Sequence, residues 1–136
     1  MGIDLKKTAI DLGLVTTNGE PMLAFYRDLL GLKLVRDMPM PGGQGMMFQL
    51  ACGDSLVKLV VLPAVPAKAA SGGIQGAAGL RYFTITVGNI TQLMQDCTDA
   101  GRKVAVSERE IRPGVRIGIV EDPDGNWVEF LSNAPQ

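Results

Sequence analysis

An internal repeat constrains this chain more than any other feature of its sequence. The segment GDSLVKL, which contains Lys58, is matched by DGNWVEF, which contains Glu129, and Asn18 is matched in the same way by Asn89. Position 18 corresponds to position 89 and position 58 to position 129, so the members of both pairs are 71 residues apart. One separation that holds at both ends of a segment indicates a duplicated structural unit. The chain is therefore predicted to contain two copies of one module.

The first copy has the pattern of a strand, a helix and three further strands. Residues 10–15 alternate like a strand, and the sequence NGEP then opens a helix that Gly31 ends. The apolar residues of this helix recur at helical spacing, at Met22, Leu23, Phe25, Tyr26, Leu29 and Leu30. Three short strands are predicted after it, separated by the loop MPMPGGQG and the turn CGDS, at residues 32–36, 46–51 and 56–62.

The second copy repeats this order. A strand is predicted at residues 82–87, and a helix at residues 89–100 that Gly101 ends. Three further strands are predicted at residues 104–107, 115–120 and 127–131.

Together the two copies predict one α+β domain over residues 1–136. The βαβββ modules lie at about 8–62 and about 80–132. The linker between them, residues 63–79, consists mainly of small residues and is long enough to cross from one module to the next.

The composition excludes several classes of function. The 13 basic and 14 acidic residues are scattered and give a net charge of −1, so no basic stripe is available to bind nucleic acid. No apolar run is long enough to span a membrane, and the first residues lack the pattern of a signal peptide, so a cytoplasmic protein is expected. Cys52 and Cys97 lie far apart and are expected to be small buried side chains, neither a disulfide nor a zinc site.

Strand alternation predicts where chemistry can occur, because successive residues of a strand point to opposite faces of the sheet. In each of four predicted strands, apolar residues occupy the positions expected to face a helix, and one ionisable residue occupies the other face. These ionisable residues are Asp11, Lys58, Tyr82 and Glu129. If the two modules pair with these faces inward, the four side chains converge near the middle of one trough.

The motifs carry a resemblance to a known family. The segments IDLGLVTTN, LAFYRDLLGLKL, GLRYFTITVGNITQLMQDCTDAG and EDPDGNWVEFLS resemble those of the vicinal oxygen chelate superfamily. This superfamily includes glyoxalases, bleomycin-resistance proteins, fosfomycin-resistance enzymes and extradiol dioxygenases. The resemblance covers nearly the whole chain, and FYRDLLGLK and DPDGNWVEF are its most specific parts. It implies a concave, half-open, barrel-like sheet with the helices outside and a small-molecule site within.

The resemblance also supplies positions for a metal. Metal-binding members use a His in the first strand, a Glu in the fourth, a His or Glu in the fifth and a Glu in the eighth. The corresponding residues here are Asp11, Lys58, Tyr82 and Glu129, and only Glu129 matches. The chain contains no histidine, and the positive charge of Lys58 opposes binding of a divalent ion. Neither a metal nor another cofactor is therefore expected.

Several side chains are candidates for binding a substrate: Met38, Met40, Met47, Thr84, Arg112, Arg116 and Trp127. The methionines, together with Met46, cluster around the MPMPGGQGMM loop and suit an irregular apolar ligand, although packing at the rim and in the core is the commoner role of scattered methionines. Trp127 offers an aromatic wall for a planar group. The two arginines flank Pro-Gly on a predicted loop that would close over the site and bind an anionic substituent; the alternative is a solvated surface.

Two functions of different kinds follow from this set. In the first, the protein is a metal-independent lyase, isomerase or hydrolase acting on a small, largely apolar oxygenated compound. Asp11 or Glu129 would then abstract a proton, and Lys58 or Tyr82 would stabilise the resulting oxyanion. In the second, the four groups only satisfy one another, and the protein binds a hydrophobic compound without transforming it. The ionisable residues favour the enzyme, while the methionines and the missing metal ligands favour a binding protein of the bleomycin-resistance type. The enzyme is the preferred interpretation, and the binding protein is the alternative.

Two further expectations concern the reaction and the assembly. Glutathione-dependent glyoxalase activity is not expected, because that chemistry depends on the metal in this superfamily. A homodimer is expected, because a half-closed sheet leaves strand edges exposed.

Overall fold

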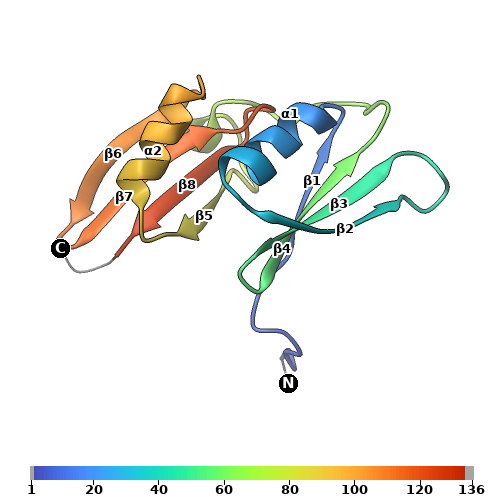
Figure 1. Ribbon diagram of the computed structural model, residues 1–136, viewed down its shortest axis with the longest axis horizontal. Coiled ribbons are helices and arrows are strands. Elements are labelled where there is room, and N and C mark those ends of the chain that lie inside the picture. Colours follow the sequence, from blue (N-terminus) through green and yellow to red (C-terminus); the bar gives the residue numbers. More distant parts are fainter. Residues whose placement is uncertain (1, 134–136) are drawn as a thin grey trace. The chain divides into compact units, whose positions relative to one another are not determined.

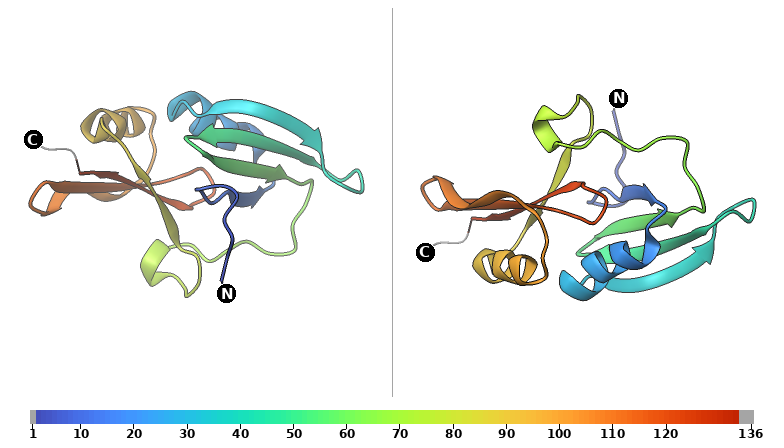
Figure 2. Two further views of the ribbon diagram at one scale, coloured as in Figure 1. Left: turned by 90° about the horizontal axis from the view of Figure 1, so that it is seen from below. Right: turned by 90° about the horizontal axis from the view of Figure 1, so that it is seen from above.

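The computed structural model describes residues 2–133 and divides into two compact units between Ala67 and Lys68. In each unit a helix packs on one face of a four-stranded sheet (Figures 1 and 2). Both units follow the order strand, helix and three strands that the repeat predicts. The α+β class and the two-module organisation predicted from the sequence are therefore confirmed.

The first unit contains one helical segment and a mixed sheet. Its elements are β1 Leu12–Thr16, α1 Gly19–Leu23, η1 Ala24–Leu29, β2 Lys33–Pro39, β3 Met46–Cys52 and β4 Ser55–Val61. The strand order is β1-β4-β3-β2, with β1 parallel to β4 and the other pairs antiparallel. The predicted helix is present, but its second part is π-helical, and the Leu30 N–H donates to the carbonyl of Phe25 at 2.9 Å.

Aromatic side chains form much of the first unit's core. Phe25 and Tyr26 are 2% and 0% exposed, and their rings meet edge to face with centroids 4.8 Å apart. The helix that carries them lies against β4, whose Val57 and Leu59 are buried. These two residues alternate with Lys58, so the predicted apolar face of this strand is confirmed.

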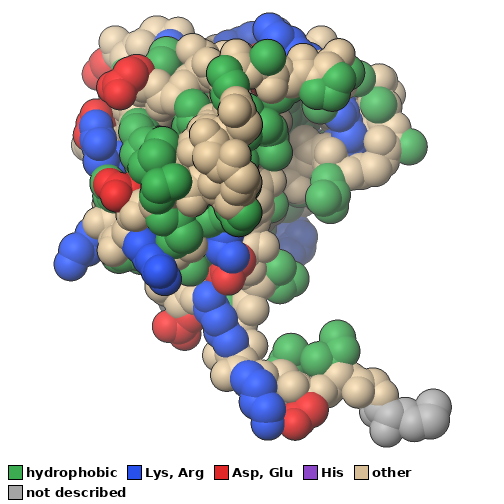
Figure 3. Space-filling model, turned by 90° about the vertical axis from the view of Figure 1, so that its right-hand side faces the viewer, with side chains coloured by type: hydrophobic (Ala, Val, Ile, Leu, Met, Phe, Trp, Pro, Cys, Tyr) green, Lys and Arg blue, Asp and Glu red, His purple; other side chains and the backbone are tan. Residues whose placement is uncertain are grey.

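The segment before β1 differs from the sequence prediction. A strand was expected from residue 10, but β1 begins at Leu12 and Ile10 is 85% exposed. The Leu56 N–H donates to the side chain of Asp11, so the ladder between β1 and β4 ends there. In the space-filling view the N-terminal residues extend away from the body of this unit (Figure 3), and Asp4 pairs with Lys6 at 2.9 Å in solvent.

The second unit repeats the topology of the first. Its elements are β5 Tyr82–Thr86, α2 Ile90–Asp99, β6 Val104–Arg112, β7 Val115–Glu121 and β8 Trp127–Ser132. The strand order is β5-β8-β7-β6. Thr84 pairs with Glu129 on parallel strands, as Gly13 pairs with Lys58 in the first unit. Positions 13 and 84, like 58 and 129, are 71 residues apart, so the repeat extends to the register of the strands.

The helix α2 packs closely on its sheet. Met94 lies over Gly118 of β7, where a Cβ atom would be 2.6 Å from the methionine sulfur, so only glycine fits without movement. Cys97 is 0% exposed, and burial raises the pKa of its thiol to about 11, as expected for a small buried side chain. No helix among residues 2–133 is long and apolar enough to cross a membrane.

A tight turn sets the start of β8. Asp122 is 3% exposed, and its Oδ1 accepts the N–H groups of Asp124 and Asn126, each at 2.9 Å. Aspartate in such a turn replaces main-chain acceptors that the chain reversal removes. The motif EDPDGN therefore positions Trp127 and Glu129 by local chemistry.

The hairpin between β6 and β7 corrects the sequence prediction. Strands were expected over residues 104–107 and 115–120, with Arg112 and Arg116 flanking Pro113-Gly114 on a loop that would close over the site. The structure extends β6 to Arg112 and begins β7 at Val115, which leaves only Pro113 and Gly114 as the turn. Gly114 has a φ of +79°, a conformation that suits glycine in such a turn. Both arginines therefore lie on strands and not on a mobile lid.

Part of the linker is ordered against the second unit. Residues Gly73–Gln75 form a single 3₁₀ turn, η2. The Arg81 guanidinium donates to the carbonyl oxygens of Gly73, Ala70 and Ser71 at 2.7, 2.8 and 3.2 Å. These three bonds fasten the linker to the residue that precedes β5.

Candidate functional site

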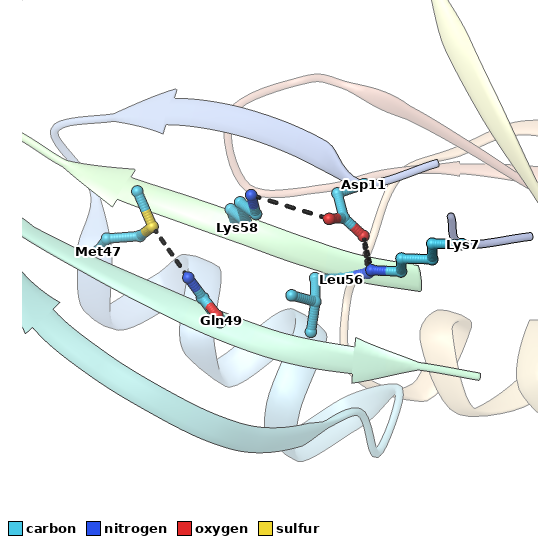
Figure 4. Close-up of polar contacts among 6 residues, drawn as sticks. All are labelled: Lys7, Asp11, Met47, Gln49, Leu56 and Lys58. Atoms are coloured by element: carbon cyan, nitrogen blue, oxygen red, sulfur yellow. Dashed lines mark hydrogen bonds and ion pairs between the residues drawn. The ribbon is translucent and has the colours of Figure 1, made fainter. Parts of the chain in front are cut away.

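Asp11 is the centre of a charged cluster in the first unit (Figure 4). Its Oδ1 accepts hydrogen bonds from Lys7 Nζ at 2.6 Å and from the Leu56 N–H at 2.8 Å, while its Oδ2 lies 3.8 Å from Lys58 Nζ. The Lys7 hydrogen bond, followed by that from Leu56, holds the pKa of Asp11 below its ordinary value. Asp11 is therefore an ionised carboxylate and a weak proton acceptor.

Lys58 lies on the face of the first sheet that α1 does not cover. It pairs with Gly13 on β1 and with Gln49 on β3, so these three residues share one face. Its ion pair with Asp11 is longer than a hydrogen bond, and the Lys58 ammonium makes no hydrogen bond with a side chain in the described part of the chain. Its ammonium donors therefore remain available to a ligand.

The predicted methionine cluster divides between the two faces of this sheet. Met38 pairs with Met47, which also pairs with Val60, and all three lie on the face of Lys58. Met46 lies on the opposite face. Met40 follows the end of β2, and its N–H donates to the Gly45 carbonyl at 3.0 Å. Met38 and Met47 are thus the methionines positioned beside Lys58.

The second unit carries its own polar group at the equivalent position. Thr84 Oγ1 donates to Glu129 Oε1 at 2.6 Å. Tyr82 pairs with Trp127 across the same two strands, so all four residues share the face opposite the buried Val128. Tyr82 is 47% exposed. Convergence of this group with Asp11 and Lys58 of the first unit stays a prediction.

Trp127 is already engaged by its own chain. Its indole N–H donates to Glu121 Oε2 at 3.3 Å, and Lys103 Nζ lies 3.4 Å from the same oxygen. The linker residue Gly73 lies so close to the indole that a Cβ atom there would overlap the ring. The linker therefore occupies a ring surface that the sequence analysis assigned to a ligand.

Arg116 is engaged on the face that carries α2. Its Nε donates to Glu108 Oε2 at 2.9 Å, and Thr91 on α2 donates to the same oxygen at 2.8 Å. The Arg116 hydrogen bond is the main cause of a lowered pKa at Glu108. Arg116 therefore joins the helix to the sheet, away from Glu129, whereas Arg112 is exposed at the end of β6.

The repeated βαβββ module, with a charged residue at the same register position in each copy, defines a class of two-module α+β proteins, and solved structures share this fold. A glyoxalase family protein from Bacillus cereus has a TM-score of 0.83 at 15% identity, covering 96% of this chain and 95% of that chain. Lactoylglutathione lyase from Agrobacterium tumefaciens has a TM-score of 0.65 at 22% identity, covering 94% and 96%. Glyoxalase I from Leishmania major has a TM-score of 0.69 at 21% identity, covering 90% and 84%.

The sequence match identifies the family. The model of the Glyoxalase/Bleomycin resistance protein/Dioxygenase superfamily matches residues 9–130, and the chain belongs to this superfamily. None of the curated proteins matches the chain in sequence. The resemblance inferred from the sequence motifs is therefore confirmed at the level of the superfamily.

The ligand positions of metal-binding members do not fit a divalent cation in the first unit. The Asp11 carboxylate lies between two ammonium groups, those of Lys7 and Lys58, which would repel such an ion. Within residues 2–133 there is no group of three or more His, Cys, Asp or Glu residues arranged to hold a metal. The function proposed below therefore depends on the protein's own side chains.

Three residues near Lys58 were missed by the sequence analysis. Lys7 binds Asp11 from the N-terminal segment, Gln49 lies beside Lys58 on β3, and Arg36 lies beside Gln49 on β2. Strand alternation had been applied to the first and the last strand of each module but not to the two strands between them, β2 and β3 in the first unit. For Gln49 the same alternation was a sufficient signal. For Arg36 it was not, because a bulge shifts the register between Leu34 and Arg36.

Proposed function

We propose that this protein binds a small, largely apolar, oxygenated molecule on the helix-free face of its first sheet, without transforming it. The proposal rests on the surroundings of the Asp11 carboxylate, which accepts hydrogen bonds from Lys7 and Leu56 and lies near the Lys58 ammonium. An efficient general base needs a pKa near the working pH, but hydrogen bonds from Lys7 and Leu56 lower the pKa of Asp11. Asp11 then acts as a fixed counter-charge that holds Lys58 in place.

The surroundings of Lys58 support binding of such a molecule. The Lys58 side chain is 34% exposed, so its ammonium group is accessible to a ligand oxygen. Met47, Met38 and Val60 lie on the same face within one or two strands of it. Methionine side chains adapt to irregular apolar shapes, so they suit the apolar part of the ligand.

A metal-independent acid–base enzyme, of lyase, isomerase or hydrolase type, is the second candidate. It is favoured by the second unit, where Thr84 orients Glu129 through a 2.6 Å hydrogen bond and Tyr82 lies on the same face. Glu129 would abstract a proton, and Tyr82 would stabilise the oxyanion that forms. Removal of such a base lowers a rate by about 10²–10⁴-fold.

One experiment separates the two functions. The wild type, Lys58→Met and Glu129→Gln are titrated with small aromatic and branched aliphatic aldehydes, ketones and carboxylic acids, and NMR follows both binding and conversion. We expect the bound compound to be recovered unchanged, and Lys58→Met to weaken binding by about tenfold or more, because a hydrogen bond from a charged donor is lost. Lys6→Met, which removes the same charge at an exposed site of the first unit, should bind normally.

A different outcome would favour the enzyme. If the wild type consumes a compound, and Glu129→Gln binds that compound equally well without consuming it, the protein is a catalyst that uses Glu129. Circular dichroism of each variant establishes that the fold is retained.

A further inference from the structure

Two neighbouring rows of side chains cross the helix-free face of the first sheet. In the first row, Gly13 pairs with Lys58, Lys58 with Gln49, and Gln49 with Arg36. Adjacent strands are about 4.8 Å apart, so side chains in such a row are near neighbours. The second row, two residues further along each strand, consists of Val15, Val60, Met47 and Met38. A polar row thus lies directly beside an apolar row.

The polar row presents hydrogen-bond donors. The Lys58 ammonium carries three donors, the Arg36 guanidinium five and the Gln49 amide two. Gln49 Nε2 contacts only the Met47 sulfur, a weak acceptor, at 3.4 Å (Figure 4). Within residues 2–133 the guanidinium group of Arg36, an exposed residue, makes no side-chain hydrogen bond or ion pair. No atom lies within 4 Å of the position that a Cβ of Gly13 would take, which leaves open space beside Lys58.

The charge of this row suits an anion with a single negative charge. Lys58 and Arg36 each contribute one positive charge. The carboxylate of Asp11 lies beside Lys58, but it is shared with Lys7, to which it is hydrogen bonded at 2.6 Å. The face is therefore positive overall, while Asp11 would repel a doubly charged group placed next to Lys58.

We propose that Lys58, Gln49 and Arg36 bind the carboxylate of a monocarboxylic acid, whose apolar part lies on Val15, Val60, Met47 and Met38. This inference rests on the proposed function, because it assigns a chemical class to the ligand of the same face. Arginine and lysine both bind carboxylates through charge-assisted hydrogen bonds, and arginine does so with two parallel bonds.

The test compares three probes that share one apolar body: phenylacetate, phenylacetamide and benzylphosphonate. Each is titrated into isotope-labelled wild-type protein and followed by the backbone amide signals. We expect phenylacetate to shift the signals of Gly13, Gln49 and Lys58 and to bind about tenfold or more tightly than phenylacetamide, because charged hydrogen bonds are the stronger. Benzylphosphonate, with its greater negative charge, should bind more weakly than phenylacetate.

Variants of the polar row test whether its side chains bind the carboxylate of phenylacetate. Lys58→Met and Arg36→Gln should each weaken phenylacetate binding by about tenfold and weaken phenylacetamide binding less, because the amide carbonyl is a neutral acceptor. Lys6→Met is the matched control and should bind all three probes like the wild type. Circular dichroism and thermal unfolding establish that each variant is folded.

Failure of this inference is distinguishable from failure of the proposed function. Equal binding of the acid and the amide, tighter binding of the phosphonate, or signal shifts confined to other residues would overturn the carboxylate assignment and leave ligand binding intact. Binding of neutral aldehydes or ketones without phenylacetate would do the same. If neither the three probes nor the neutral compounds bind, both proposals are wrong.

Discussion

Asp11 connects three parts of the first unit through one carboxylate. Lys7, in the N-terminal segment, and the Leu56 N–H, on β4, donate hydrogen bonds to this carboxylate. Lys58, also on β4, forms an ion pair with it. All three neighbours favour the ionised form, which is why the pKa of Asp11 is lowered. A group whose pKa is lower in the folded than in the unfolded protein stabilises the fold only while it is ionised.

We expect Asp11→Asn to lower the free energy of unfolding at neutral pH. The stabilisation by Asp11 is complete above its unfolded pKa, near 3.8, and is lost as the pH falls through the lower folded pKa. Denaturant unfolding gives the free energy of unfolding of the wild type and of Asp11→Asn at about pH 7 and about pH 3. The difference in this free energy between the two proteins should be smaller at the lower pH. Asp4→Asn, at an exposed pair, is the control; a difference that does not change with pH would contradict this explanation.

Among the elements of the chain, the linker is more ordered than its composition predicts. Its small residues favour a flexible chain, yet Arg81 binds three of its carbonyl groups and Gly73 packs on the indole of Trp127. Gly73 has a φ of +56°, so this contact requires glycine for two reasons, its backbone conformation and its missing side chain.

We expect Gly73→Ala to destabilise the second unit by about 2 kcal/mol or more, because a left-handed backbone and a clash with the ring add together. Trp127 is the only tryptophan in the chain, so its fluorescence reports the displacement of the linker directly. Gly79→Ala is the matched control, since φ there is +104° but no atom lies within 4 Å of the added Cβ. If Gly73→Ala and Gly79→Ala lower the free energy of unfolding equally, the contact with Trp127 does not contribute to stability.

For the whole molecule, the charges at the family's metal-ligand positions affect how tightly a metal ion can bind. We expect the purified protein to contain transition metal far below one ion per chain, because Lys7 and Lys58 flank Asp11. Treatment with a chelator should leave ligand binding unchanged. Elemental analysis that finds tightly bound zinc, nickel or iron at one ion per chain would contradict this.

A homodimer is the expected assembly because each sheet has edge strands. The strand order places β1 and β2 at the edges of the first sheet and β5 and β6 at the edges of the second. Exposed edge strands offer unpaired main-chain groups to another chain. We therefore expect light scattering to give about twice the mass of the 14.5 kDa chain. A single-chain mass over a wide concentration range would exclude a dimer.

The two modules and the faces of their strands could be predicted from the residues alone. The 71-residue separation predicted two βαβββ units, and alternation placed Lys58 opposite the buried Val57 and Leu59. These predictions succeeded because the alternation of a strand is a local property that its own residues specify. The extension of β6 to Arg112 was missed because residues 108–112 are mostly charged and show no apolar alternation, so their pairing with β7 became visible only in three dimensions.

The partner of each functional side chain could be identified only from the three-dimensional fold. Lys7 binds Asp11, the linker covers Trp127 and Glu108 holds Arg116, and none of these contacts follows from strand alternation. Arg36 joined the row of Lys58 through a bulge in β2, which changes the register without a clear signal in the residues around it. A side chain's face depends on its neighbours in the strand, but its partners come from segments that only the folded chain brings within reach.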